Sequence, residues 1–436
     1  MRRMARYGTI ATTLCLWATQ AAAQEAATST LDTGDTAWML ASSALVLFMT
    51  PGLALFYGGM TRQKNILSTI MHSYFIIGIV SLQWAVLGYT LAFGTDIGSV
   101  IGGFDYLFLN GVGQGPSPFA KTIPDLLFVA YQGMFAVITP ALISGAFAER
   151  MRFGPFVVFT LLWSTLVYDP IAHWVWGGGW LGAGHVGALD FAGGTVVHIS
   201  SGVAALAAAI VLGRRIGWPK EPVIPNNLPL TVLGAGILWF GWFGFNAGSA
   251  LASNGLAASA FVTTHLAAAA ATVSWGLAEY LQRGKASVLG AASGSVAGLV
   301  AITPAAGFVG PMPAILIGLG AGLLCYFAVS VKFALRYDDS LDVVGVHCVG
   351  GTFGAIATGL FASAAVNSAG ADGLFYGNAA QVGAQVIAVV ATIGYSFVVS
   401  FILLKVVDAT MGLRATEDEE VMGLDLSQHG ERAYNL

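Results

Sequence analysis

The feature that most constrains this chain is the recurrence of apolar runs, each about 20 residues long, that carry almost no charged side chains. A helix of about 20 residues spans the hydrocarbon layer of a bilayer, because each residue rises about 1.5 Å. Only 9% of the 436 residues are charged, whereas a soluble domain has about 25%. The pattern predicts an all-α polytopic membrane protein and excludes an ordinary soluble domain.

We expect about eleven such spans after the N-terminal segment. Their approximate limits come from where charged and turn-forming residues interrupt the apolar runs. The predicted spans are 36–59, 66–93, 123–147, 153–172, 191–213, 228–247, 256–282, 286–303, 312–335, 345–364 and 380–408.

Lysines and arginines test this map independently, because cytoplasmic loops are enriched in them. Almost all of them follow odd-numbered spans, whereas the alternate loops contain only Lys121. We therefore predict that the N-terminus lies outside the cytoplasm and the C-terminus inside, in the plasma (inner) membrane. The basic residues after odd-numbered spans are Arg62, Lys64, Arg150, Arg152, Arg214, Arg215, Lys220, Arg283, Lys285, Lys332, Arg336, Arg414 and Arg432.

The two ends of the chain differ from its apolar middle. Residues 1–23 combine three arginines, an apolar core and the small-residue sequence "AAAQ", which is typical of a cleaved signal peptide. An uncleaved first helix is the alternative. Residues 24–411 form the predicted eleven-span domain, and the polar, acidic residues 412–436 form a cytoplasmic tail.

Two histidines lie inside apolar spans at matching places. His198 lies in the fifth span and His347 in the tenth, and an aspartate precedes each, in "DFAGGTVVH" and "DVVGVH". An odd number of spans per unit inverts the second unit relative to the first. The sequence therefore predicts a five-plus-five inverted repeat followed by one C-terminal helix.

Ionisable side chains inside a membrane point to function by default, because placing them there is costly. Two imidazoles side by side would share one proton and titrate as a unit, and would offer a polar path to a small neutral molecule or to a proton. Two alternatives remain at this stage. In the first, the histidines only bridge neighbouring helices; in the second, they are the axial ligands of a haem in a membrane redox protein.

Asp190 and several aromatic residues complete the set of candidates. Asp190 precedes the fifth span, where it would act either as a helix cap or as a buried carboxylate that favours a cation. Ring faces near the Ser249 hydroxyl would attract an ammonium-type cation, although tryptophans at span ends are also interfacial anchors. The rings in question belong to Phe135, Trp174, Trp176, Trp180, Trp242, Phe243 and Phe245.

With these residues in view, the chain resembles the ammonium transporter family, the bacterial Amt group related to Rhesus proteins. The similarity extends over essentially the whole mature sequence. It is carried by "FMTPGLALFYGGM", "YQGMFAVIT", "IAHWVWGGGW", "GALDFAGGTVVH", "GWFGFNAGSA", "DVVGVHCVGG" and the tail "GLDLSQHGERAYNL".

The resemblance implies a homotrimer in which each subunit has its own central pore. It implies an outer ammonium site made by Trp176, Phe135 and Ser249, and a gate made by Phe135 and Phe245. It further implies an essential Asp190 for deprotonation or electrostatic attraction, and a pore lined by His198, His347 and Trp242. The tail would receive a PII-type nitrogen regulatory protein. No enzymatic activity, cofactor or metal is expected.

A further alternative is an ammonium sensor that transports little and signals through a PII-type partner. Neither the NPA pair of a water channel nor the TVGYG filter of a potassium channel occurs, and no GxxxxGK[ST] motif for nucleotide binding is present. We therefore expect transport down a gradient.

Overall fold

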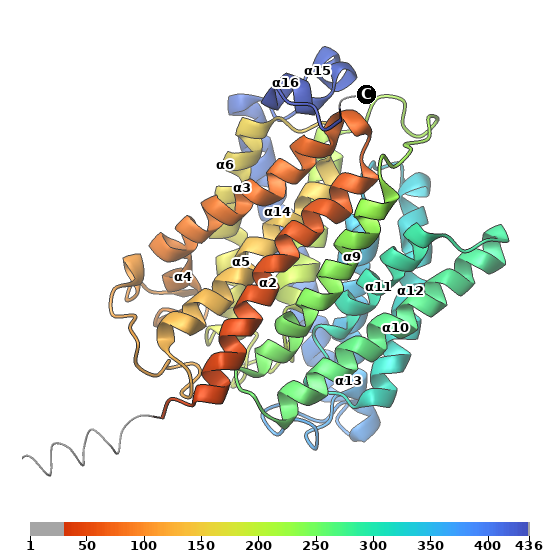
Figure 1. The fold of residues 1–436 in the computed structure, drawn as a ribbon. Helices are drawn as coiled ribbons and strands as arrows, with labels where there is room; N and C mark the ends of the chain where they lie inside the picture. Colours follow the sequence, from red (N-terminus) through yellow and green to blue (C-terminus); the bar gives the residue numbers. More distant parts are fainter. Residues whose placement is uncertain (1–29, 435–436) are drawn as a thin grey trace, which may run out of the picture.

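The computed structural model describes residues 30–434, which form a bundle of long helices with two short helices at one end (Figure 1). The predicted signal peptide, residues 1–23, lies outside the described residues. Within the described residues, ten helical stretches are long and apolar enough to cross a membrane, and α11 is a shorter apolar helix. The spans are α2 (Thr33–Met60), α3 (Ile66–Gln83) with η2 (Trp84–Gly88) and α4 (Tyr89–Phe93), α5 (Asp125–Phe147), α6 (Phe153–Trp163) with η4 (Ser164–Tyr168) and α7 (Asp169–Trp176), η5 (Gly194–Ile199) with α8 (Ser200–Leu212), α9 (Leu228–Trp242) with η6 (Phe243–Ala247) and η7 (Gly248–Ala250), α10 (Gly255–Arg283), α11 (Val288–Ile302), α12 (Pro311–Leu335), η8 (Val344–Cys348) with α13 (Val349–Phe361), and α14 (Ala380–Met411).

The eleven predicted spans all correspond to helices, with differences at their ends. The eighth is α11, whose 15 residues reach only about 22 Å at 1.5 Å per residue. It is mostly buried and packs between α9, α10, α12 and α13, so neighbouring helices surround it. The fourth span continues to Trp176, beyond its predicted end at residue 172.

The remaining elements are short and lie between the spans or after the last one. A small antiparallel hairpin and a 3₁₀ turn follow α4, and the tail forms two helices. These elements are η1 (Gln63–Asn65), β1 (Asp96–Ile97), β2 (Ile101–Gly102), η3 (Leu107–Leu109), η9 (Leu374–Tyr376), α15 (Glu417–Met422) and α16 (Leu424–His429).

Five of the spans contain a π-helical turn: η2, η4, η5, η6 and η8. Each π turn adds one residue to the helical repeat and so rotates the side chains that follow it, and such turns are frequent at functional sites. His198 lies in η5, His347 in η8 and Phe245 in η6. Three of the candidate residues are therefore oriented by irregular turns rather than by regular α-helix.

The two histidine-bearing spans begin at opposite ends of the bundle. Just before η5, the backbone of Leu189 exchanges hydrogen bonds with the side chain of Gln385, near the start of α14. Just before η8, the Asp338 carboxylate accepts from Arg150. The Arg150 carbonyl in turn accepts from the amide of Ala415, beyond the end of α14. The span that begins with η5 and the span that begins with η8 therefore run in opposite directions and are similar in composition. Both features agree with the predicted inverted repeat.

Small residues allow these two half-helices to approach each other. A Cβ added at Gly202 of α8 would collide with the backbone nitrogen of Cys348 in η8. Glycine lets the two backbones come within contact distance, and His198 and His347 lie on these same two segments. This close contact is one reason why the imidazoles can meet.

The basic residues gather at the end of the bundle that carries the tail, as the alternation of charged loops predicts. Arg215 pairs with both Glu149 and Asp338, at 3.4 and 2.8 Å, and Arg62 pairs with Glu149 at 2.8 Å. Burial opposes ionisation of Glu149, but hydrogen bonds from Arg62 and the charge of Arg215 outweigh it, so the pKa of Glu149 is lowered. Its contribution to stability is present at neutral pH and is lost as the pH falls through this lowered pKa.

The tail is docked on the turn between α2 and α3. The Asp425 carboxylate accepts from the amides of Leu67 and Ser68, at 3.0 and 2.8 Å, at the start of α3. The Lys64 ammonium group donates to two carbonyls in α15, and the amide of Leu424 donates to Asn65. The tail therefore supplies the N-terminal cap of a membrane span.

Candidate functional site

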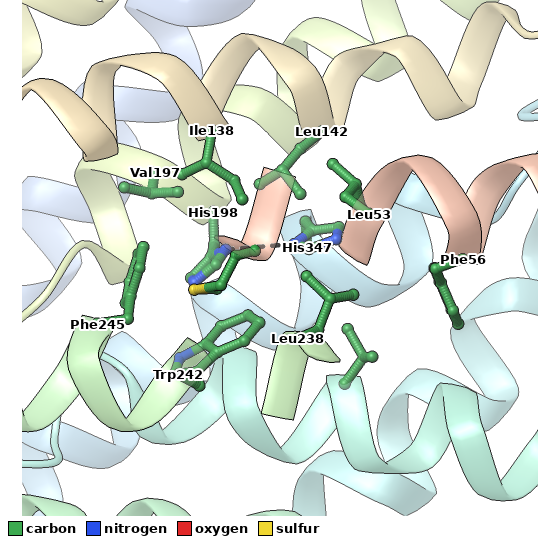
Figure 2. Close-up of a pocket in the computed structure, with 12 residues that line it drawn as sticks. Leu53, Phe56, Ile138, Leu142, Val197, His198, Leu238, Trp242, Phe245 and His347 are labelled. Atoms are coloured by element: carbon green, nitrogen blue, oxygen red, sulfur yellow. Dashed lines mark hydrogen bonds between the residues drawn. The ribbon is translucent and has the colours of Figure 1, made fainter. Parts of the chain in front are cut away.

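A narrow cavity lies in the middle of the subunit, between η5, η6, η8 and the helices around them (Figure 2). Its volume is about 10 Å³, which is about what a single water molecule needs. Most of the lining is aliphatic or aromatic. The lining residues are Met49, Leu53, Phe56, Ile138, Leu142, Val197, His198, Leu238, Trp242, Phe245, Val296 and His347.

The two histidines face each other in this cavity, as Figure 2 shows. Their Nδ1 atoms are 3.2 Å apart, and their exposed fractions are 1% for His198 and 4% for His347. One Nδ1 must donate and the other accept, so the neutral pair contains two different tautomers. Nε2 of His198 is buried and has no hydrogen-bond partner among residues 30–434. The pair therefore retains unused hydrogen-bonding capacity in an apolar lumen.

This geometry does not fit a bis-histidine haem. The two Nδ1 atoms are in direct hydrogen-bonding contact, whereas axial ligands must lie on opposite faces of a porphyrin with the iron between them. The cavity around them has room for about one water-sized molecule. The redox alternative is therefore not supported by the residues that suggested it.

A series of aromatic rings connects this cavity to the end of the bundle opposite the tail. Ring centroids are 6.0 Å apart for Trp176 and Phe135, and 4.3 Å for Phe135 and Phe245. The series continues from Phe245 to His198 at 6.1 Å and from His198 to His347 at 5.3 Å. Phe135 and Phe245 are both 1% exposed, and their rings lie between Trp176 and the histidines in this series.

Trp242 lies against the histidines on one side of the lumen. Its ring is stacked on His198 with centroids 5.4 Å apart. Its Nε1 donates to Thr303 Oγ1 at 2.9 Å. The indole nitrogen is thus hydrogen-bonded to the residue that follows α11, and the ring presents an apolar face to the cavity.

Ser249 lies close to the ring pair, together with a residue that the sequence reasoning missed. The Tyr131 hydroxyl is 3.2 Å from Ser249 Oγ, which itself donates to the carbonyl of Phe245 at 2.9 Å. Tyr131 is fully buried, and its ring contacts Phe135 in an edge-to-face arrangement. A spacing of four residues in "YQGMF" places Tyr131 and Phe135 on one helix face, and this signal could have identified it.

Asp190 occupies the position of a helix cap and is 8% exposed. Its Oδ1 accepts from the amides of Gly193 and Gly194, at 2.7 and 2.6 Å. Its Oδ2 accepts from the amide of Thr195 at 2.7 Å, from the Thr195 hydroxyl, and from the amide of Val196 at 3.3 Å. Both oxygens are therefore used in holding the start of η5. The Asp190 carbonyl accepts from Trp176 Nε1 at 2.9 Å, which connects this cap to the outer aromatic residue.

The aspartate that corresponds to Asp190 in the second repeat is Asp339 rather than Asp342, the one matched to it from the sequence. Asp339 precedes His347 by eight residues, as Asp190 precedes His198, and its Oδ2 accepts from the amide of Val344 at 2.7 Å. Asp342 instead pairs with Lys332. The sequence before His347 contains two aspartates in addition to Asp342. Choosing the aspartate nearest to the histidine selected the wrong residue, whereas choosing the one eight residues before it identifies Asp339.

Comparison with known proteins decides the family. The Ammonium Transporter Family matches residues 37–434. The chain belongs to the ammonium transporter family. An ammonium transporter from Bacillus subtilis is 56% identical over 402 residues, which cover 92% of this chain and 98% of that protein. An ammonium transporter from Aquifex aeolicus is 51% identical over 436 residues, which cover 99% and 100%.

Solved structures agree with this membership of the ammonium transporter family. The crystal structure of Candida albicans Mep2 matches with a TM-score of 0.85 and 40% identity over 93% of this chain and 91% of that one. A structure titled "Sensor Amt Protein" matches with a TM-score of 0.84 and 30% identity over 91% and 98%. The predicted family and the all-α polytopic fold are confirmed, and the protein is a multi-pass transporter rather than an enzyme.

Proposed function

We propose that this ammonium transporter family member receives NH4+ at its outer end and conducts its nitrogen as ammonia past the twin histidines into the cytoplasm. The cation would be held among Trp176, Phe135 and Ser249, where ring faces and a hydroxyl oxygen replace water. The single observation that carries the proposal is the series of rings from Trp176 to His347. It ends in an apolar lumen with room for about one water-sized molecule.

Selectivity follows from the lumen's chemistry. A bare cation entering a largely apolar cavity loses its hydration at high cost, and potassium cannot reduce that cost. Ammonium can, because it can release a proton and cross as neutral ammonia. The shared-proton histidine pair would then either guide ammonia alone or relay the proton as well.

Asp190 would act in this scheme through its charge and its cap. Both of its oxygens already accept protein hydrogens, so direct proton transfer to Asp190 would have to displace one of them. We infer that its negative charge favours the cation nearby, and that its cap maintains the half-helix that bears His198. The proton that ammonium releases near Asp190 would not remain on this carboxylate. It would either pass along the pair of His198 and His347 or return to the outer solution.

The transport proposal is tested by current measurements on proteoliposomes adsorbed to a solid-supported membrane. Matched pulses of ammonium chloride and potassium chloride should give a transient current with ammonium only. Ammonia uptake without current, followed by an internal pH dye, would identify neutral ammonia as the net species. Equal currents with both salts would contradict the proposed selectivity, and no response in either assay would favour the sensor alternative.

We further propose that the protein is a homotrimer in the plasma (inner) membrane, with its tail in the cytoplasm as the site for a PII-type regulatory protein. The support is the gathering of arginines at the tail end and the docking of residues 412–434 there. Truncation after Gly412 should weaken binding of a PII protein at least about tenfold while the bundle still folds. Size-exclusion chromatography with light scattering would check the trimer and the fold, and unchanged PII affinity would contradict the tail's role.

A further inference from the structure

A second buried carboxyl group lies in the membrane-spanning region, outside the cavity. Asp169 is 0% exposed and begins α7, directly after the π turn η4. Gln83 ends α3, directly before the π turn η2. The Gln83 Nε2 donates to Asp169 Oδ2 at 2.8 Å and to Thr165 Oγ1 at 3.1 Å. The two side chains therefore join the irregular turns of two neighbouring spans.

The carboxyl group of Asp169 has no compensating charge among the residues from 30 to 434. Every ion pair found in this part of the chain involves other acidic residues. Asp169 Oδ1 and Gln83 Oε1 are both buried and both lack a hydrogen-bond donor. Burying an unpaired carboxylate costs far more free energy than burying a neutral acid. A single cause would account both for the unpaired charge and for the two oxygens without a donor.

One additional proton on Asp169 accounts for both oxygens that lack a donor. The Gln83 amide uses both N–H groups as donors, because the Thr165 hydroxyl itself donates to the carbonyl of Leu161 at 2.9 Å and so accepts from Gln83. Only the amide oxygen remains free. A proton on Asp169 Oδ1 would neutralise the acid and give Gln83 Oε1 a donor at the same time.

We propose that Asp169 is a neutral carboxylic acid that forms a cyclic acid–amide pair with Gln83, and that this pair positions α7 and thereby Trp176. The pair is a positioning device and does not touch the substrate. Its effect on ammonium recognition rests on the proposed function, in which Trp176 forms part of the outer site. Gly88 leaves room for the amide, because a Cβ there would lie 2.9 Å from Gln83 Oε1.

The link to Trp176 runs along α7. Trp176 lies seven positions after Asp169, or about 10 Å further along the helix axis. The outer end of α7 is held by His173, whose Nδ1 and Nε2 each lie 2.9 Å from an oxygen, of Ala92 and Asp96 respectively. The inner end is held by the acid–amide pair. Loss of the inner attachment would let α7 tilt and move the Trp176 ring relative to Phe135.

Transport kinetics with matched variants test the positioning. Asp169→Asn can keep both hydrogen bonds, because its amide donates to Gln83 Oε1 and accepts from Gln83 Nε2, so its KM for ammonium should stay within about twofold of wild type. Asp169→Leu and Gln83→Leu remove the pair and should each raise KM about tenfold, with the maximal current within about threefold. The double leucine variant should be no worse than either single variant, because both remove the same interaction.

Infrared spectroscopy tests the proton independently of transport. The wild-type protein should show the carbonyl stretch of a buried protonated acid at neutral pH, and Asp169→Asn should lack it. The spectral comparison needs neither leucine variant, so it remains decisive if those fail to fold. No such band, or a KM for Asp169→Asn as high as for Asp169→Leu, would overturn the proposal. Absence of both ammonium current and ammonia uptake from wild type would instead contradict the proposed function and leave the spectral test intact.

Discussion

Replacing Asp190 with alanine is expected to abolish ammonium transport, with a loss of at least about a hundredfold in uptake rate. The substitution removes the acceptor of four backbone amides and one hydroxyl at the start of η5. Each buried donor left without a partner costs about 1–3 kcal/mol, and 1.4 kcal/mol already corresponds to a factor of ten. The same substitution removes the negative charge that the proposed function uses to favour the cation, next to Trp176.

The measurement is uptake into proteoliposomes, with circular dichroism and size-exclusion chromatography to show that the variant folds. Thr195→Val is the matched control, because it removes only the hydroxyl donor and leaves all the amides bonded to the carboxylate. Its uptake should fall by no more than about threefold. If Asp190→Ala lost only some thermal stability and still transported ammonium, Asp190 would be a cap without a role in conduction.

Replacing His198 and His347 together with leucine should lower ammonium flux at least about tenfold or remove its selectivity over potassium. The double substitution leaves the lumen without its shared proton and without the free Nε2 of His198. Ammonia would then cross the cavity with no hydrogen-bonding partner, at a cost of about 1–3 kcal/mol for an unsatisfied polar group.

Currents from alternating ammonium and potassium pulses, combined with the internal pH dye, separate the two outcomes. Leu142→Met is a suitable control, since it alters the wall of the same cavity without changing its polar groups. Single histidine substitutions should also be damaging, because each leaves the remaining Nδ1 without its partner at 3.2 Å. Wild-type flux and selectivity in the double variant would eliminate the imidazole relay.

The sequence predicted the fold more completely than it predicted the site. Hydropathy predicted all eleven spans, and the alternation of basic loops predicted that Arg62, Arg150 and Arg215 would lie at one end, where they form ion pairs with Glu149 and Asp338. The site residues expected from the family resemblance lie along one route through the subunit, yet Tyr131 was missed. From the sequence, Asp342 was matched to Asp190, whereas the hydrogen bonds identify Asp339 as the counterpart of Asp190.

The sequence by itself determined that the chain is a bundle of membrane-spanning helices, because about 20 apolar residues in lipid must satisfy their backbone hydrogen bonds as helices. That requirement is local and can be read from composition. Only the tertiary structure decided which side chains meet. A π turn shifts the helical register by one residue, or about 100°, and spans that are apolar on every side carry no periodicity that would reveal the shift. The sequence suggested that His198 and His347 pair, but the 3.2 Å contact between their Nδ1 atoms and the pairing of Gln83 with Asp169 both depend on such turns, so the geometry of each contact was decided only when the helices packed.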